Sequence, residues 1–135
     1  MADTMVDSCV LIDVIKEDPL WAEWSATALT KAADTGRVVI NQLVYAEVSL
    51  SLAAPGQLDA ALDDLVDRED LPWKAAELAA AAHAEYRRRG GAKTSPMPDF
   101  YIGAHAAVHG YQLLTRNRKD FTSYFPGLDI VSPGH

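Results

Sequence analysis

The chain has 135 residues, with 19 acidic and 12 basic side chains and a formal net charge of −7. Its 49% hydrophobic and 23% charged residues exclude a disordered chain and predict one domain spanning residues 1–135. No apolar run is long enough to cross a membrane, and the N-terminus lacks the features of a signal peptide, so we expect a cytoplasmic protein. Its single cysteine, Cys9, excludes an internal disulfide and suits a reducing compartment.

Short apolar runs predict the strands of a buried sheet. These runs are residues 4–6, 38–40, 111–115 and 129–131, with a possible short edge strand at residues 71–73. Helical periodicity predicts helices at residues 21–33, 43–53, 58–66, 74–89 and 99–109, a further helix after Asp7, and a basic loop or helical turn at residues 116–121. Strands that alternate with helices indicate an α/β fold, in which a short parallel sheet forms the middle of a three-layer α/β/α sandwich.

Polar side chains follow the predicted strands at the edge where such sheets bind ligands. Asp7 follows the first strand, and Glu47 lies in the helix after the second. Asn117 and Asp120 follow the third strand, and Asp99 opens the helix that leads into it. Carboxylates that come together repel one another unless a cation joins them, and Mg²⁺ or Mn²⁺ prefers such oxygen ligands. Because these ions promote phosphodiester hydrolysis, the set predicts a metal-dependent nuclease.

Each of these acidic residues also has a simpler interpretation when it is taken alone. Asp7 and Asp99 could cap the helices that they precede. Glu47 and Asp120 could be solvated surface charges. The prediction of a metal site therefore depends on the whole set.

Four segments of the chain resemble a PIN domain, and more closely the VapC-type toxins of bacterial type II toxin–antitoxin pairs. They are residues 6–13, the region of Glu47, residues 98–106 and residues 113–121. This resemblance covers nearly the whole chain and implies a Mg²⁺-dependent endoribonuclease that forms a homodimer and is inhibited by a cognate antitoxin. Asp7, Glu47 and Asp99 fall at the three main acidic positions of the family, where they would be catalytic and bind the metal.

The fourth acidic position departs from the family pattern, which usually has Asp after a Thr-Arg pair. This chain has Asn117 there, so either its carbonyl oxygen or the carboxylate of Asp120, three residues later, would complete the site. Ser8 and Thr115 match small hydroxyl positions that orient ligands or water in the family.

Basic residues cluster in the last part of the chain, although its overall charge is acidic. Residues 81–135 hold 7 basic and 4 acidic side chains, whereas residues 1–80 hold 5 and 15. Because the phosphates of nucleic acids attract Lys and Arg, this local excess of basic residues is compatible with RNA binding. Lys93 and Arg116 are our candidates for phosphate contacts, and the run at residues 87–89 suits either a phosphate contact or the end of a helix.

Other side chains have simpler expected roles. His105 and His109 have the i, i+4 spacing of a zinc pair, but no third His or Cys ligand is evident, so we expect packing or surface roles. Cys9 has no basic neighbour in the sequence and is expected to be a small buried side chain rather than a nucleophile. Trp21, Trp24 and Trp73 are expected in core or dimer contacts rather than in a platform that stacks bases.

Two other functions are consistent with parts of the sequence. Asp7 after a buried strand would suit a phosphatase with an Asp nucleophile, but the second Asp that such enzymes carry two residues later is replaced by Cys9. Asn117 and the acidic surface would suit a catalytically inactive, PIN-like binding module. Such a module would cleave no RNA in the presence of Mg²⁺ or Mn²⁺.

Overall fold

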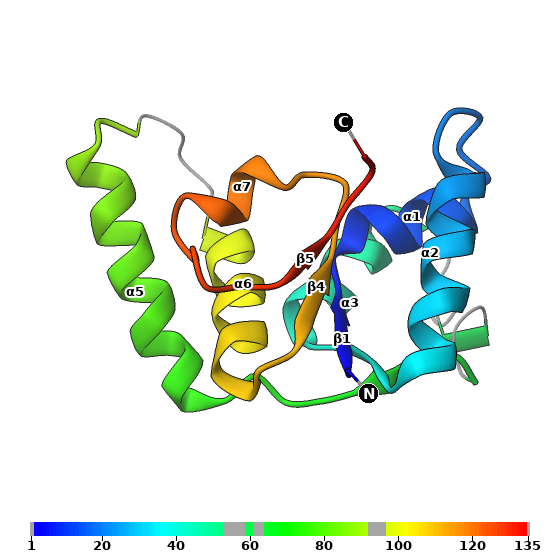
Figure 1. Cartoon of the computed structure of the whole chain (residues 1–135), viewed down its shortest axis with the longest axis horizontal. Coiled ribbons are helices and arrows are strands. Elements are labelled where there is room, and N and C mark those ends of the chain that lie inside the picture. Colours follow the sequence, from blue (N-terminus) through cyan, green and yellow to red (C-terminus); the bar gives the residue numbers. More distant parts are fainter. Residues whose placement is uncertain (1, 53–58, 61–63, 92–96, 135) are drawn as a thin grey trace.

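The described strands form one five-stranded parallel sheet in the order β3-β2-β1-β4-β5. The computed structural model describes residues 2–52, 59–60, 64–91 and 97–134 (Figure 1). The strands are β1 (Thr4–Val6), β2 (Val38–Ile40), β3 (Asp67–Arg68), β4 (Gln112–Leu114) and β5 (Ile130–Val131). The central strands are apolar because helices bury them, and Met5 of β1 pairs with Val39 on one side and Leu113 on the other.

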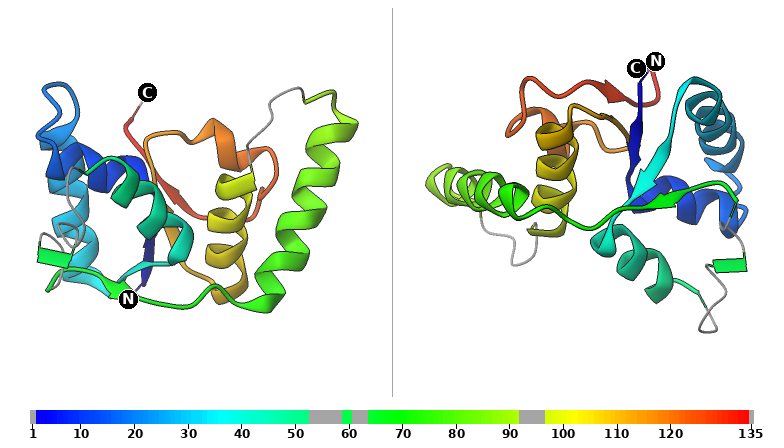
Figure 2. Two further views of the ribbon diagram at one scale, coloured as in Figure 1. Left: turned by 180° about the vertical axis from the view of Figure 1, so that it is seen from behind. Right: turned by 90° about the horizontal axis from the view of Figure 1, so that it is seen from below.

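Helices lie on both sides of this sheet, which confirms the predicted α/β/α sandwich. They are α1 (Ser8–Ile15), α2 (Ala22–Thr35), α3 (Gln42–Leu50), α5 (Trp73–Arg88), α6 (Met97–His109) and α7 (Lys119–Thr122). Figure 2 shows α1 and α2 on one side of β1 and the α5–α6 pair on the other. The chain therefore buries the sheet between two helical layers.

Helix α6 is buried between the sheet and α5. Its side chains Ile102 and Ala106 belong to the sheet core, whereas Phe100 and Ala104 pack with the small alanines of α5. Gly110, with φ +70°, ends the helix and turns the chain into β4. Because α6 is enclosed in this way, the position of Asp99 in its first turn is fixed by packing on two sides.

Two of the predicted elements differ in the structure. The edge strand expected at residues 71–73 is wrong: the strand is β3, and Trp73 is instead the first residue of α5. Pro72 precedes that helix in an extended conformation, because its fixed φ and missing N–H suit a helix start. Of the helix predicted at residues 58–66, residues 59–60 are helical and 64–65 form a turn, while 58 and 61–63 lie outside the described residues.

Candidate active site

The buried carboxylate of Asp7 joins the end of β1 to the start of α1. Its Oδ1 accepts the backbone N–H of Ser8 at 2.8 Å, which caps the helix. Its Oδ2 accepts the hydroxyl of Thr115 at 2.7 Å and the thiol of Cys9 at 3.6 Å. The side chain is only 4% exposed. Asp7 therefore caps a helix, as the simpler interpretation expected, while it also faces the ends of two neighbouring strands.

The surroundings of Asp7 disfavour its negative charge. Burial raises the pKa of Asp7 above its ordinary value, and the negative charge of Asp120 raises it further. Hydrogen bonds from Thr115, Cys9 and the Ser8 N–H act in the opposite direction but are outweighed. A buried carboxylate in this state gains free energy when a cation binds next to it.

Glu47 lies close to Asp7, although 40 residues separate them in the sequence. Helix α3 carries Glu47, whose Oε1 accepts the hydroxyl of Ser8 at 3.0 Å. The side chain is half-buried, and burial and the nearby charge of Asp7 both raise the pKa of Glu47. Ser8 thus ties the second carboxylate to the helix that Asp7 caps.

Thr115 orients the segment that follows β4. Its buried hydroxyl donates to Asp7 and also accepts the backbone N–H of Asn117 at 3.0 Å. The side chains of Asn117 and Asp120 are exposed, and the N–H of Asp120 donates to the Asn117 carbonyl oxygen at the start of α7. The structure therefore brings the charge of Asp120 near Asp7 and gives Asn117 a backbone contact with Thr115. We call Asp7, Glu47 and Asp120 the acidic edge.

Asp99, the remaining acidic candidate from the sequence, lies at the start of α6. Asp99 is half-buried in the first turn of α6, and this helix runs into β4 through Gly110. Its first turn is therefore on the side of the carboxyl end of β4, where the acidic edge lies (Figure 1). Lys93 is outside the described residues.

Arg116 forms a buried ion pair that the sequence analysis missed. Its Nε and one terminal nitrogen donate to the two oxygens of Asp13 at 2.7 and 3.1 Å, and its guanidinium lies 5.1 Å from the ring of Trp21. Asp13 is 2% exposed and also accepts the hydroxyl of Ser25 at 2.8 Å. The only signal in the sequence was a lone acidic residue within the apolar run of α1. Arg116 thereby anchors the Thr115–Asn117 segment to α1 and α2.

Burial also decides the role of Cys9. It raises the pKa of the thiol to about 12, and the nearby charge of Asp7 contributes further. The thiol is therefore neutral and serves as a hydrogen-bond donor to Asp7. This agrees with the expectation that Cys9 is not a nucleophile.

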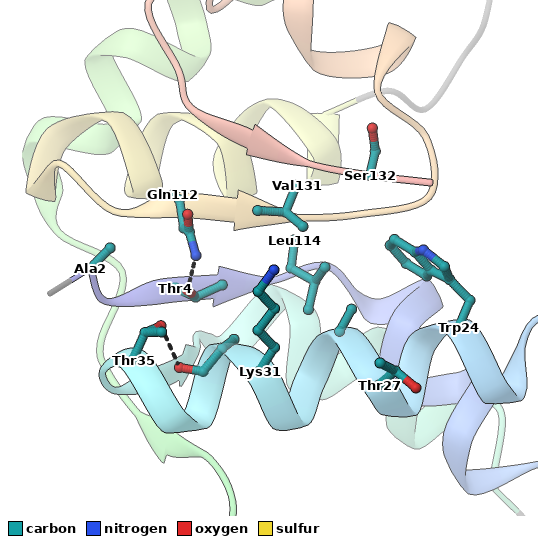
Figure 3. A pocket seen from close by; sticks show the side chains of 12 residues that line it. Ala2, Thr4, Trp24, Thr27, Lys31, Thr35, Gln112, Leu114, Val131 and Ser132 are labelled. Atoms are coloured by element: carbon teal, nitrogen blue, oxygen red, sulfur yellow. Dashed lines mark hydrogen bonds between the residues drawn. The ribbon is translucent and has the colours of Figure 1, made fainter. Parts of the chain in front are cut away.

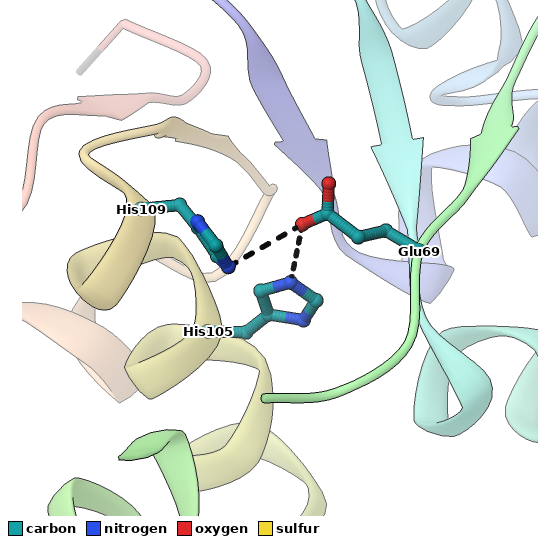
Figure 4. Close-up of side chains that lie close together, drawn as sticks. All are labelled: Glu69, His105 and His109. Carbon is teal, nitrogen blue, oxygen red and sulfur yellow. Dashed lines mark hydrogen bonds and ion pairs between the residues drawn. The ribbon is translucent and has the colours of Figure 1, made fainter. Parts of the chain in front are cut away.

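A second polar cluster lies away from the acidic edge and consists of Glu69, His105 and His109 (Figure 4). Their ligand atoms lie within 4.8 Å of one another and could hold a metal ion. The sequence analysis found no third His or Cys ligand, and the third group of this cluster is a carboxylate, Glu69, from the segment after β3. His105 is fully buried, as expected for a packing role, whereas His109 is exposed at the surface.

A cavity of about 640 Å³ lies between α2 and strands β1, β4 and β5 (Figure 3). Its lining combines apolar residues such as Trp24 and Leu114 with polar ones such as Lys31. None of the lining residues has a carboxylate. This cavity is therefore separate from the acidic edge and lacks the oxygen ligands of a Mg²⁺ site.

Comparisons with known proteins agree with this architecture. The model of the PIN domain family matches residues 4–124, so the chain belongs to the PIN domain family. No curated protein matches the chain. None of the described helices combines the length and apolar character needed to span a membrane.

Solved structures of toxin–antitoxin complexes share this fold over almost their full length. A chain of a toxin–antitoxin complex from Klebsiella pneumoniae is 25% identical, with a TM-score of 0.73 over 98% of this chain and 99% of that one. DNA-bound VapBC from Salmonella typhimurium contains a chain that is 22% identical, with a TM-score of 0.72 and coverage of 98% of both chains. A chain of FitAcB from Neisseria gonorrhoeae is 19% identical, with a TM-score of 0.75 over 98% of this chain and 99% of that one.

Proposed function

We propose that this PIN domain is the toxin of a type II toxin–antitoxin pair and a metal-dependent endoribonuclease. The observation that carries the proposal is the buried carboxylate of Asp7, with Glu47 and Asp120 close enough to interact with its charge. Membership of the PIN family and the shared fold with chains of VapBC complexes support the same function. The phosphatase alternative is weaker, because the neutral thiol of Cys9 stands where its second Asp would be.

The residues of the acidic edge suit Mg²⁺ or Mn²⁺ better than a softer metal, because their donors are carboxylate oxygens. Asp7 and Asp99 would bind the ion, with Glu47 and Asp120 as further ligands. A divalent ion held there would polarise the phosphodiester and stabilise the leaving oxygen. Glu47, held by Ser8, would orient the attacking water, while Thr115 holds Asp7 in place.

We assign the fourth acidic position to Asp120 rather than to Asn117. Asp120 contributes a negative charge that acts on Asp7. Asn117 uses its backbone N–H to contact Thr115, and its side chain has no charge to attract a cation. Asn117 would then have a supporting catalytic role beside the ion or the RNA.

RNA would approach the acidic edge from the side of the β4–α7 segment. Arg116 uses Nε and one terminal nitrogen to bind Asp13, which leaves its other terminal nitrogen outside that pair. We propose that this nitrogen and the side chain of Lys93 contact RNA phosphates. These cations would offset the repulsion between the acidic edge and the RNA backbone.

We further propose two protein partners, a cognate antitoxin and a second copy of the chain. An antitoxin could place an Arg against Asp7, Glu47 or Asp99, because a guanidinium can bind two carboxylate oxygens in place of the metal. Competition between Mg²⁺ and the antitoxin would test this, and unchanged affinity in saturating Mg²⁺ would argue against it.

The second copy would cover exposed apolar side chains. Leu20, Leu50 and Trp73 are 76%, 87% and 92% exposed. Trp21 and Trp24 are half-buried within the chain, and Trp24 packs against the hydrophobic core, which is one of the roles that we expected for it. Light scattering at micromolar concentration should give the mass of a dimer, and the mass of a monomer would contradict this proposal.

The main experiment incubates a mixed RNA pool with the protein in Mg²⁺, in Mn²⁺ and in EDTA. We expect internal cleavage with either ion, none with EDTA, and none with an Asp99→Asn variant that remains folded. An inactive binding module would leave the RNA intact in all conditions. Release of phosphate from a small monoester without RNA cleavage would instead favour the phosphatase.

A further inference from the structure

A buried hydrogen bond joins the two helices that carry Glu47 and Asp99. Asn41, the N-cap of α3, contacts Nδ1 of His105 on α6 through its amide nitrogen at 3.0 Å. Asn41 is 2% exposed and His105 is fully buried. The two residues come from segments that are 64 positions apart, so this contact ties together distant parts of the chain.

The cap of α3 fixes the direction of this hydrogen bond. The side-chain oxygen of Asn41 accepts the N–H groups of Leu43 and Val44 at 2.9 and 3.1 Å, so its NH₂ group must face His105. Nδ1 of His105 is therefore the acceptor, and the ring proton lies on Nε2, which donates to Glu69 at 2.8 Å. Burial lowers the pKa of His105, which favours this neutral form.

This proton position argues against a metal ion as the main partner of the histidine cluster. A metal on Nε2 would leave the proton of a neutral ring on Nδ1, where it would face the NH₂ group of Asn41. Rotating that amide would instead break the cap of α3. Glu69 is also occupied, because it accepts the hydroxyl of Tyr111 at 2.8 and 3.1 Å. The cluster is consequently better explained as a hydrogen-bond network.

The Asn41–His105 hydrogen bond lies the same number of residues from Glu47 on α3 as it does from Asp99 on α6. Glu47 follows Asn41 by six residues on α3, and Asp99 precedes His105 by six residues on α6. Each carboxylate residue is therefore about 9 Å along its helix from the Asn41–His105 bond. Helix α3 also packs directly against α6.

We infer that the Asn41–His105 hydrogen bond is a positioning contact that sets the relative placement of Glu47 and Asp99, and thereby the affinity of the site for its divalent ion. The inference rests on the proposed function, in which both carboxylates face that ion. Neither Asn41 nor His105 touches the metal or the RNA. Their effect is transmitted through the two helices, whose relative shift the buried bond restricts.

Two substitutions of His105 separate its two hydrogen bonds. The amide of Asn reaches about as far as Nδ1, so His105→Asn keeps an acceptor for Asn41 and loses the bond to Glu69. The amide of Gln reaches about as far as Nε2, so His105→Gln keeps a donor for Glu69 and loses the bond to Asn41. Asn41→Ser keeps a helix cap and removes the donor to His105. Glu69→Gln keeps both bonds of His105 and is the matched control.

The experiment measures Mn²⁺ affinity of the full chain without RNA, from the electron paramagnetic resonance signal of free Mn²⁺. We expect His105→Gln and Asn41→Ser to weaken Mn²⁺ binding about tenfold, as loss of a supporting contact typically does. His105→Asn and Glu69→Gln should stay within about twofold of the natural chain, and the Asn41→Ser/His105→Gln double variant should be no weaker than either single variant. Circular dichroism identifies the variants that are folded.

The inference would be overturned if the folded His105→Gln and Asn41→Ser variants bound Mn²⁺ as tightly as the natural chain. It would also be overturned if His105→Asn and His105→Gln lost the same amount of Mn²⁺ affinity. If the variants that lose the bond do not fold, ¹⁵N chemical shifts of His105 in the natural chain remain decisive, because a protonated Nδ1 would also overturn it. Failure of the proposed function looks different: the natural chain would bind Mn²⁺ without cleaving RNA, or its Mn²⁺ affinity would not depend on Asp99.

Discussion

The hydroxyl of Thr115 donates a hydrogen bond of 2.7 Å to Oδ2 of Asp7, across 108 positions of the sequence. The contact exists because β1 and β4 are neighbours in a parallel sheet, so both strands end at the same edge. The same hydroxyl accepts the N–H of Asn117. One small side chain therefore controls both the charge of Asp7 and the path of the chain after β4.

Thr115→Val should lower RNA cleavage by about 10- to 100-fold, because it removes this support of the carboxylate that we propose as a metal ligand. The hydrogen bond lowers the pKa of Asp7, so its loss raises that pKa further and makes metal binding weaker at acidic pH. Cleavage measured between pH 6 and 8 should show the larger loss at the acid end. Thr115→Ser keeps the hydroxyl and should retain most of the cleavage activity. An equal loss of cleavage in the Thr115→Ser and Thr115→Val variants would contradict this role of the hydroxyl.

Asp7→Asn should abolish cleavage and leave the metal-free protein folded. Because burial raises the pKa of Asp7, its charge opposes folding at neutral pH, and removing the charge offsets the lost bond with Thr115, which is worth about 1 kcal/mol. Thermal unfolding in EDTA should give a midpoint equal to or above that of the natural chain. Mg²⁺ should raise the midpoint of the natural chain only. A variant that cleaves RNA normally would remove Asp7 from the site.

Arg116→Ala should destabilise the protein by about 3 kcal/mol, because it leaves the buried carboxylate of Asp13 without its cation. Urea unfolding measures this loss, and the Asp13→Ala/Arg116→Ala double variant should lose less than the sum of the two single variants. Arg118→Ala is the matched control: Arg118 is exposed and contacts Ser132 and the carbonyl of Ile130, so its loss should cost about 1 kcal/mol or less. Equal losses at the two arginines would contradict the structural role of Arg116.

The contribution of His105 to the stability of the protein should fall as the pH drops below about 6.5. Burial lowers the pKa of His105 below its ordinary value of 6.5, so the unfolded chain takes up a proton at a pH where the folded chain does not. The stabilising effect is therefore complete above about pH 6.5 and declines by up to about 1.4 kcal/mol for each pH unit below it. Urea unfolding at pH 7.5 and 5.5 should show a smaller difference for His105→Asn than for the natural chain. An unchanged difference would mean that His105 is protonated in the folded state.

The sequence allowed prediction of the elements whose side chains pack in a regular pattern. Short apolar runs located β1, β2, β4 and β5, and the rule that parallel strands end at one edge placed Asp7 beside the segment after β4. Strand β3 could not be predicted, because Asp67 and Arg68 are exposed and only their pairing with β2 makes them a strand. Local apolar patterning carries no information about such an edge.

Polar pairs between distant parts of the chain could not be predicted from the sequence either. Arg116 and Asp13 are separated by 103 positions, and His105 and Glu69 by 36. Taken alone, each of these residues resembles an ordinary helix or loop residue. Only the folded structure shows which polar side chains pair with one another. The identity of the acidic candidates could thus be predicted from their residue types and positions, whereas the groups that support them required the structure.

The hydrogen bonds of Asp7 limit which ion the site can select. A carboxylate has about four lone-pair directions. Within the described part of the chain, Ser8, Thr115 and Cys9 occupy three of them, one on Oδ1 and two on Oδ2. Asp7 can then offer an ion a single direction, on Oδ1, and cannot bind it through both oxygens. Ca²⁺ often takes both oxygens of a carboxylate and six to eight ligands in all, whereas Mg²⁺ accepts one oxygen from each of a few carboxylates and keeps its water. The two hydrogen bonds that Asp7 accepts on Oδ2 would thus favour the smaller ion at the proposed metal site.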